Sequence, residues 1–228
     1  MMRTPAAEPA KPLLCMDAVS LRLSDGGSSK PISWQILIGQ CWAIVGPNGS
    51  GKSTLMKGLC GRLPLAGGEL IYHFSRNGAS GQGASGADRP QDQIAYVDFR
   101  GHQARLGLRS TFHQACWNSL SSGTAPSVSE LLSPERVKGL NPFLVHEALE
   151  EPAGFQERRC QIVGVLGIEG LLDKSIIQVS NGERRKVLLA QALLREPRLL
   201  ILDNPFTGLD RRNRTKLAEI ITDLMRAL

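Results

Sequence analysis

Residues 46–53 read Gly46-Pro47-Asn48-Gly49-Ser50-Gly51-Lys52-Ser53, which matches the spacing Gly-x-x-x-x-Gly-Lys-Ser/Thr. A continuous apolar run at 41–45 precedes them and predicts a strand that is covered on both faces. Apolar residues at helical spacing follow them as far as Leu63. A glycine-rich turn between a strand and a helix points backbone N–H groups at an anion, so these residues predict a phosphate-binding loop.

The polar side chains of this loop have separable roles. Lys52 is expected to reach the outer phosphates of a nucleotide, and the Ser53 hydroxyl to ligate Mg²⁺. Thr54 adds a further phosphate contact. The alternative is an ordinary glycine-rich turn with an exposed lysine, but the strand and the helix predicted on either side favour the phosphate loop.

A carboxylate ends a second apolar run, Leu199-Leu200-Ile201-Leu202-Asp203. In phosphate-loop enzymes an Asp at the end of such a strand holds the magnesium shell. Buried strands also end in Asp for turn or capping reasons, so this run is informative because the chain already contains the loop. We therefore expect Asp203 and Ser53 to be the metal ligands.

A third element, Val179-Ser180-Asn181-Gly182-Glu183, opens a basic amphipathic helix. Ser180 and Glu183 have the spacing of a capping box, and a small, glycine-bearing helix start also suits an anion. The basic clusters at 184–186 and 211–216 are interpreted as solvated helix faces, because no aromatic residues are interleaved with them. We therefore do not expect nucleic acid to be a partner.

The rest of the pattern is typical of an α/β chain. Strands are expected from alternation or apolar runs at 13–23, 32–38, 70–74, 94–97 and 199–202. Helical periodicity covers about 103–172, then 183–195, then a last helix with the apolar stripe Leu217, Ile220, Ile221, Leu224 and Leu228. Residues 1–12 are interpreted as a flexible tail, and about 75–93 as a low-complexity surface insertion.

Composition narrows the class of protein. The 228 residues carry 27 Lys+Arg against 21 Asp+Glu, a net charge of +6, and are 42% hydrophobic, as in ordinary globular proteins. The apolar runs fall far short of the roughly 18 to 20 residues of a bilayer span, which excludes a channel made by this chain alone. Five widely spaced cysteines without zinc-ligand spacing indicate a reducing, cytoplasmic compartment.

Together the three elements resemble the ATP-binding cassette (ABC) family of ATPases, whose signature Leu-Ser-Gly-Gly-Gln is similar to residues 179–183. Residues 207–210 resemble a later loop of that family, which implies an intersubunit contact for Asp210. The runs 33–46, 168–173 and 199–210 resemble the molybdenum-transport and photorepair branch, which commonly carries two cassettes in one polypeptide.

The resemblance implies a fold and a ligand. The fold is an α/β P-loop NTPase sheet over 13–228, with an antiparallel β subdomain and an inserted α-helical subdomain at about 103–175, apparently without the last strand or strands of the family. The cofactors are ATP and Mg²⁺. The implied nucleotide contacts are Gly46, Pro47, Asn48, Gly49, Ser50, Gly51, Lys52, Ser53 and Thr54 from one cassette, with Ser180 and Gly182 from a second.

The sequence departs from the family where the catalytic groups belong. Asn204 stands where the family has a water-polarising Glu, and the loss of a general base typically slows a reaction roughly 10²- to 10⁴-fold. Asn204 before Pro205 can also be a tolerated turn residue. The magnesium-sensing Gln corresponds to Gln103, with His102 and an ordinary loop Gln as alternatives. No His follows Asp203, so the switch His of the family is absent from this sequence.

These residues predict an ABC-type ATPase domain that binds Mg-ATP, dimerises around it and hydrolyses it slowly. The expected partners are a second cassette, as a homodimer or a tandem partner, and a membrane transporter subunit that would hold this domain at the inner face of a membrane. The rival hypothesis is a regulatory module that uses nucleotide only to set its dimer state. A fragment of a longer protein is a third reading.

Overall fold

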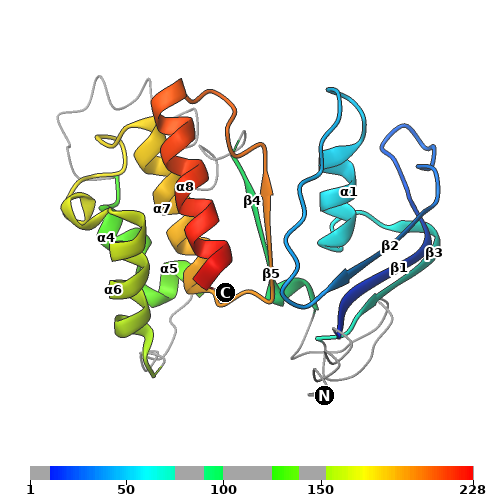
Figure 1. Ribbon diagram of the computed structural model, residues 1–228, viewed down its shortest axis with the longest axis horizontal. Helices are drawn as coiled ribbons and strands as arrows, with labels where there is room; N and C mark the ends of the chain where they lie inside the picture. The colour runs from blue at the N-terminus through cyan, green and yellow to red at the C-terminus, as the bar shows by residue number, and fades with distance from the viewer. Residues whose placement is uncertain (1–10, 75–89, 100–124, 139–152, 228) are drawn as a thin grey trace, which may run out of the picture. The chain divides into compact units, whose positions relative to one another are not determined.

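The computed structural model describes residues 11–74, 90–99, 125–138 and 153–227 (Figure 1). These residues form two compact units, one that extends to Ile94 and one from Ala95 to Ala227. Each unit has its own sheet and its own buried core.

The first unit is built on a three-stranded antiparallel sheet in the order β2-β1-β3. Its strands are β1 (Pro12–Leu21), β2 (Ile32–Leu37) and β3 (Leu65–Tyr72), and α1 (Lys52–Leu59) is its helix. Alternation in β1 buries one set of side chains, so the strands expected at 13–23 and 32–38 are confirmed. The core of this unit contains Leu14, Met16, Val19, Leu21, Leu59, Leu70 and Tyr72.

A bulge bends β1 where it passes β3. The pairing register shifts between Asp17 and Ser20, and Ala18 has a φ of 46°. Opposite this bulge, Gly68 has a φ of 78°, and a Cβ atom built on it would lie 2.2 Å from the Ala18 carbonyl oxygen. Only glycine therefore fits at this point of β3.

The expectation of a covered strand at 41–45 is wrong in this structure. The run has no strand conformation, and Trp42 and Val45 are 56% and 88% exposed. An apolar run becomes a strand only when neighbouring strands bind its N–H and C=O groups, and none of the strands described in the first unit pairs with it. Trp42 instead packs edge-to-face on Trp34, with ring centroids 5.3 Å apart.

Two element boundaries also differ from the sequence-based expectation. The helix after the loop ends at Leu59 rather than near Leu63, because Gly61 adopts a left-handed φ of 64°. β3 begins at Leu65, five residues before the expected start. Of the proposed tail 1–12, residues 1–10 lie outside the described residues, and Pro12 already opens β1.

The second unit combines a two-stranded sheet with helices. Its strands are β4 (Ile94–Asp98) and β5 (Leu199–Asp203), where expected. The helices are α4 (Val128–Leu131), α5 (Pro134–Lys138), α6 (Phe155–Leu166), α7 (Asn181–Leu194) and α8 (Arg211–Ala227), and a 3₁₀ turn lies at Glu169–Leu171. A second 3₁₀ turn, at Pro90–Gln93, precedes β4 and belongs to the first unit. None of the helices in the described part is long and apolar enough to cross a membrane.

Helices α6 and α7 pack together over the core of the second unit. Val187 and Leu189 of α7 are fully buried there, with Leu166 of α6 and Ile168 beyond it. Leu217 of α8 is buried, and Ile220 and Leu224 pack against the same core, as the predicted stripe requires for these positions. Leu228, the last residue of that stripe, lies outside the described residues. Of the region expected to be helical at about 103–175, the structure describes 125–138 and 153–175; of the insertion at about 75–93, it describes 90–93.

The bulge yields a stability test with a matched control. Gly68→Ala should lower the free energy of unfolding by about 3 kcal/mol, because the new methyl group collides with the Ala18 backbone and strains a left-handed residue. Gly67→Ala should change it by less than about 0.5 kcal/mol, because a Cβ at Gly67 meets nothing within 4 Å. Urea unfolding measures both; equal losses would show that the bulge does not constrain β3.

Candidate functional site

The predicted phosphate loop forms a tight turn directly before α1. Gly49 and Gly51 have φ angles of 81° and 87°, a conformation open mainly to glycine. Gly51 is the N-cap of α1, and no side-chain hydrogen bond caps this helix end. The N–H groups of the first turn are therefore left for an anion. All six residues from Gly46 to Gly51 are exposed, and Ser53 and Thr54 are half-buried.

Lys52 folds back over this loop. Its ammonium group donates to the carbonyl oxygens of Gly46 and Pro47, at 2.9 and 2.7 Å, and to Ser50 Oγ at 3.3 Å. The positive charge therefore lies over the same turn whose backbone N–H groups open toward solvent. Such a loop can hold a phosphate group through main-chain amides and one cation.

Asp203 ends β5 as a buried carboxylate, 7% exposed. The Tyr96 hydroxyl donates to its Oδ2 at 2.8 Å, and Asn204 Nδ2 donates to its Oδ1 at 2.6 Å. Asn204 has a left-handed φ of 55°, which Asn tolerates better than most residues. Each carboxylate oxygen has two lone pairs, so one on each oxygen remains for a cation.

The predicted metal ligands suit magnesium by their chemistry. Mg²⁺ prefers hard oxygen donors and is commonly held by one or two protein groups together with substrate phosphates and water. The Asp203 carboxylate and the Ser53 hydroxyl are donors of this kind, and they belong to different units. The described residues contain no cluster of three or more His, Cys, Asp or Glu.

The signature-like residues start α7 in the predicted capping box, which is confirmed. The Ser180 N–H donates to Glu183 Oε2 at 2.7 Å, and the Glu183 N–H donates to Ser180 Oγ at 3.3 Å. The hydrogen bond from the Ser180 hydroxyl is the main cause that lowers the pKa of Glu183, and Lys174 and Lys186 contribute. Ser180 is exposed and Gly182 half-buried, so the start of α7 remains accessible.

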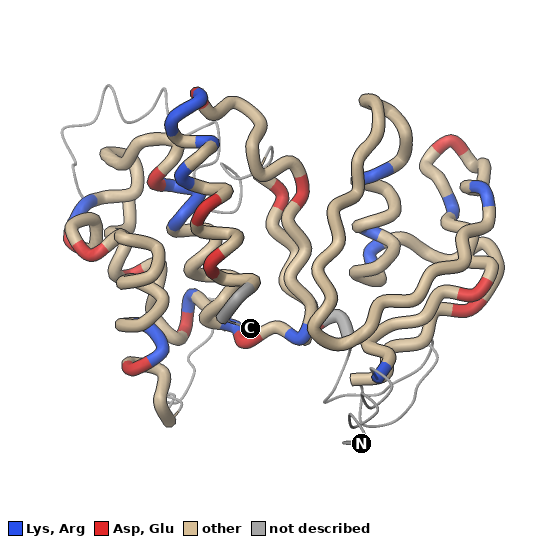
Figure 2. The backbone as a smooth tube through the Cα atoms, in the orientation of Figure 1, with Lys and Arg blue, Asp and Glu red and all other residues tan. Residues whose placement is uncertain are grey.

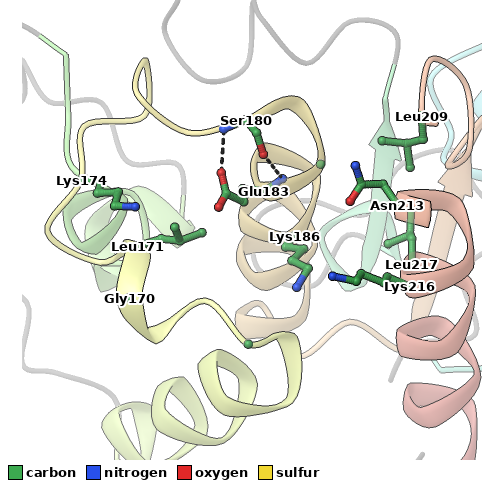
Figure 3. A pocket seen from close by; sticks show the side chains of 12 residues that line it. Gly170, Leu171, Lys174, Ser180, Glu183, Lys186, Leu209, Asn213, Lys216 and Leu217 are labelled. Atoms are coloured by element: carbon green, nitrogen blue, oxygen red, sulfur yellow. Dashed lines mark hydrogen bonds between the residues drawn. The ribbon is translucent and has the colours of Figure 1, made fainter. Parts of the chain in front are cut away.

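A basic cavity of about 400 Å³ opens beside this helix start (Figure 3). Lys174, Lys186 and Lys216 line it together with Glu183, and Figure 3 shows the ammonium groups of Lys186 and Lys216 pointing toward one another. Lys186 also donates to the Leu166 carbonyl oxygen at 2.7 Å. Lys174 and Lys216 could not be assigned to this site from the sequence, because no local pattern links them to the signature-like residues.

The basic run 184–186 is not the solvated face that the sequence predicted. Arg184 donates to the carbonyl oxygens of Ile176 and Ile177, and Arg185 is only 3% exposed. The run packs inward because α7 lies against α6 and against the loop that follows β5. The exposed residues 211–216 of α8 do fit a solvated face, and Figure 2 shows the charges along the chain.

Arg185 forms hydrogen bonds with the loop that follows Asp203. Its two terminal nitrogens donate to the carbonyl oxygens of Pro205 and Thr207, and its guanidinium lies 5.4 Å from the centre of the Phe99 ring. Burial lowers the pKa of Arg185 from its usual value. Asp210, at the end of this loop, accepts a hydrogen bond from the Asn213 N–H at 3.0 Å and so caps α8.

Two pairs of the predicted site residues lie together in the second unit. Asp203 and Asn204 are in direct contact, and Ser180 and Gly182 lie at the start of one helix. The phosphate loop lies in the other unit. Gln103 and His102 lie outside the described residues, so their predicted roles stay predictions.

Comparison with known sequences identifies relatives over most of the chain. A family model described as "ABC transporter" matches residues 29–207. The ABC transporter ATP-binding protein ModF of Escherichia coli is 34% identical over 206 residues, which cover 90% of this chain and 35% of ModF. The zinc transport system ATP-binding protein TroB of Treponema pallidum is 28% identical over 199 residues, 86% of this chain and 63% of TroB. The chain thus spans less than two thirds of these relatives.

Solved structures share the fold. cbiO1 of Clostridium perfringens, described as part of an ABC transporter complex, has a TM-score of 0.71 at 23% identity, over 96% of this chain and 75% of cbiO1. An ATP-binding cassette of an ABC transporter in its ADP conformation has a TM-score of 0.66 at 17% identity, over 95% of this chain and 78% of that one. The fold is therefore that of ABC ATPases, α/β with an antiparallel β subdomain.

The buried arginine yields a local prediction. Arg185→Met should raise amide hydrogen exchange at Thr207 and Leu209 at least tenfold, because two hydrogen bonds from a charged donor to the loop are lost. Hydrogen–deuterium exchange read out by mass spectrometry measures the change. Arg212→Met, which alters an exposed arginine on the first turn of α8, is the control and should leave this loop unchanged. Equal exchange in both variants would contradict the role of Arg185.

Proposed function

This chain belongs to the ABC transporter family, and on that basis we propose that it is an ATP-binding cassette that binds Mg-ATP, dimerises around it and hydrolyses it slowly. The observation that carries the proposal is the phosphate loop, with Lys52 over it and an uncapped helix behind it. A triphosphate carries several negative charges, and this arrangement offers both a cation and converging N–H groups.

Each part of the proposed site has a defined task. Lys52 neutralises and orients the outer phosphates, while Ser53 and Asp203 hold the magnesium ion. When bound, that ion neutralises charge on the β- and γ-phosphates. Ser180 and Gly182 of a second cassette close over the γ-phosphate, and the accessible start of α7 beside a basic cavity supports this task.

Slow hydrolysis follows from the chemistry of Asn204. A general base must accept a proton from the attacking water, whereas the Asn204 amide nitrogen already donates to Asp203. The phosphate-binding groups do not depend on Asn204, so nucleotide binding is retained. Gln103 is proposed to orient water or sense magnesium, as the family resemblance implies.

The wider role is proposed from the relatives. The described transport and import functions of TroB and other relatives support a transport ATPase whose partners are a second cassette, in a homodimer or in tandem, and a membrane subunit. Such a domain would be cytoplasmic and peripheral to the membrane. Similarity to ModF supports the molybdenum-transport and photorepair branch. The proposed domain covers 13–228, with an inserted helical subdomain at about 103–175 and the surface insertion at about 75–93.

A second candidate function is a regulatory module in which ATP sets only the dimer state. The hydrogen bond from Asn204 to Asp203 favours it, because that contact leaves the magnesium-side carboxylate without a neighbouring general base. Sizing with and without Mg-ATP, paired with a phosphate-release assay, separates the two. Measurable turnover supports the ATPase, and nucleotide-dependent dimers without turnover support the module.

The phosphate loop gives the direct test of the proposal. Lys52→Ala should weaken Mg-ATP binding by about 10- to 100-fold, because charge-assisted hydrogen bonds to phosphate are lost. Lys57→Ala, an exposed lysine in the last turn of the same helix, should change it by less than twofold. Titration calorimetry measures both. A folded wild-type protein that takes up no Mg-ATP, or equal affinity in both variants, would overturn the proposal.

The Asn204 position gives the test of slow turnover. Asn204→Glu should raise ATP hydrolysis at least tenfold, because a carboxylate can accept the proton of the attacking water. Glu has to adopt the left-handed conformation that Asn204 occupies, so some stability will be lost. Asn204→Gln, with the same chain length but no base, is the control. A rate that stays at the wild-type level in both variants would remove Asn204 as the cause of slow turnover.

A further inference from the structure

The buried hydrogen bond between Tyr96 and Asp203 joins two strands that are far apart in sequence. Tyr96 lies in the middle of β4 and is 4% exposed, and Asp203 ends the neighbouring strand β5. The Phe99 N–H also donates to the Asp203 carbonyl oxygen at 3.3 Å. Main chain and side chain of Asp203 are thus both held by the segment that contains β4.

We propose that Tyr96 is a positioning residue that fixes the orientation of the Asp203 carboxylate for the magnesium ion of bound ATP, with Asn204 as the second holder. This inference rests on the proposed function. It assigns a positioning role to Tyr96 and Asn204, which belong neither to the phosphate-binding loop nor to the signature-like residues.

The contacts of the carboxylate support this task. Each carboxylate oxygen accepts a hydrogen bond from one neutral donor, Oδ2 from Tyr96 and Oδ1 from Asn204. Two such bonds on opposite oxygens restrict rotation of the carboxylate group about its last single bond. The hydroxyl donor is itself buried in a β-strand, so its own position is fixed by packing.

The lack of an ion pair at Asp203 among the described residues also supports this role. Among the described residues, Asp203 forms no ion pair with Lys or Arg. Neutral donors orient the carboxylate group without placing a cationic side chain beside it, which leaves that place open to a metal ion. Hydrogen-bonded partners of metal ligands commonly change metal affinity 10- to 100-fold when they are removed.

The chain offers a matched control tyrosine. Tyr72 is also buried in a strand, and its hydroxyl donates to the Leu59 carbonyl oxygen at 2.9 Å, in the first unit. Burial raises the pKa of Tyr72 above its usual value, so its hydroxyl stays a donor at neutral pH. Tyr72→Phe and Tyr96→Phe therefore remove the same group from equally buried strands, and only the second removal touches Asp203.

The experiment compares ATP affinity in EDTA with ATP affinity in excess Mn²⁺, a substitute for Mg²⁺ that is visible by electron paramagnetic resonance. The ratio of the affinity in Mn²⁺ to the affinity in EDTA isolates the contribution of the metal. Tyr96→Phe should lower this ratio about tenfold, and should alter the resonance spectrum of bound Mn²⁺, while its affinity in EDTA stays within twofold of wild type. Tyr72→Phe should leave ratio and spectrum unchanged.

Asp203→Asn separates the failure of this inference from that of the proposed function. If Asp203→Asn lowers the ratio but Tyr96→Phe behaves like Tyr72→Phe, Tyr96 has no positioning role and the proposed function stands. If Asp203→Asn leaves the ratio unchanged, the assignment of Asp203 to the metal is itself wrong. Should Tyr96→Phe fail to fold, Asn204→Ala removes the other donor and is expected to lower the ratio in the same way.

Discussion

A charged group that leaves water must be met by polar partners, and this constraint shapes the second unit. Asp203 and Arg185 are the two buried charged residues of the described part of the chain, and they do not pair with each other. Both charges are hydrogen-bonded to neutral groups. A hydroxyl and an amide donate to Asp203, and two carbonyl oxygens accept from Arg185. The segment from Asp203 to Thr207 is therefore held at one end through its own carboxylate and at the other by a guanidinium from α7.

This arrangement links the candidate metal ligand to the signature-like helix within one unit. Arg185 lies on α7 five residues after Ser180, and its side chain fixes the backbone that begins one residue beyond Asn204. One side chain of α7 therefore joins this helix by hydrogen bonds to the loop that follows β5. The aromatic ring of Phe99, which follows β4, completes the packing around the guanidinium.

Local patterns in the sequence predicted local features well. The glycine spacing predicted the turn before α1, and the Ser-x-x-Glu spacing predicted the cap of α7, because both depend on residues within one or two turns of chain. Alternation predicted β1 and β2 for the same reason. The predictions that failed concern features that depend on partners elsewhere in the chain. Residues 41–45 have no pairing strand among the described residues of their unit, and Arg185 is buried by a loop some twenty residues away. Tyr96 and Asp203 are 107 positions apart, so no pattern in the sequence alone could predict their contact.

The exposed indole of Trp42 has a practical consequence. Its ring is fixed against Trp34 and by a hydrogen bond from its own Nε1 to Gln40 Oε1 at 3.1 Å, and it precedes Gly46 by only four residues. Indole emission shifts with the polarity of its surroundings, so this edge-to-face pair is a native optical probe of the segment that leads into the glycine-rich turn. A change in the packing of Trp42 on Trp34 can therefore be followed by intrinsic fluorescence, without attaching a dye.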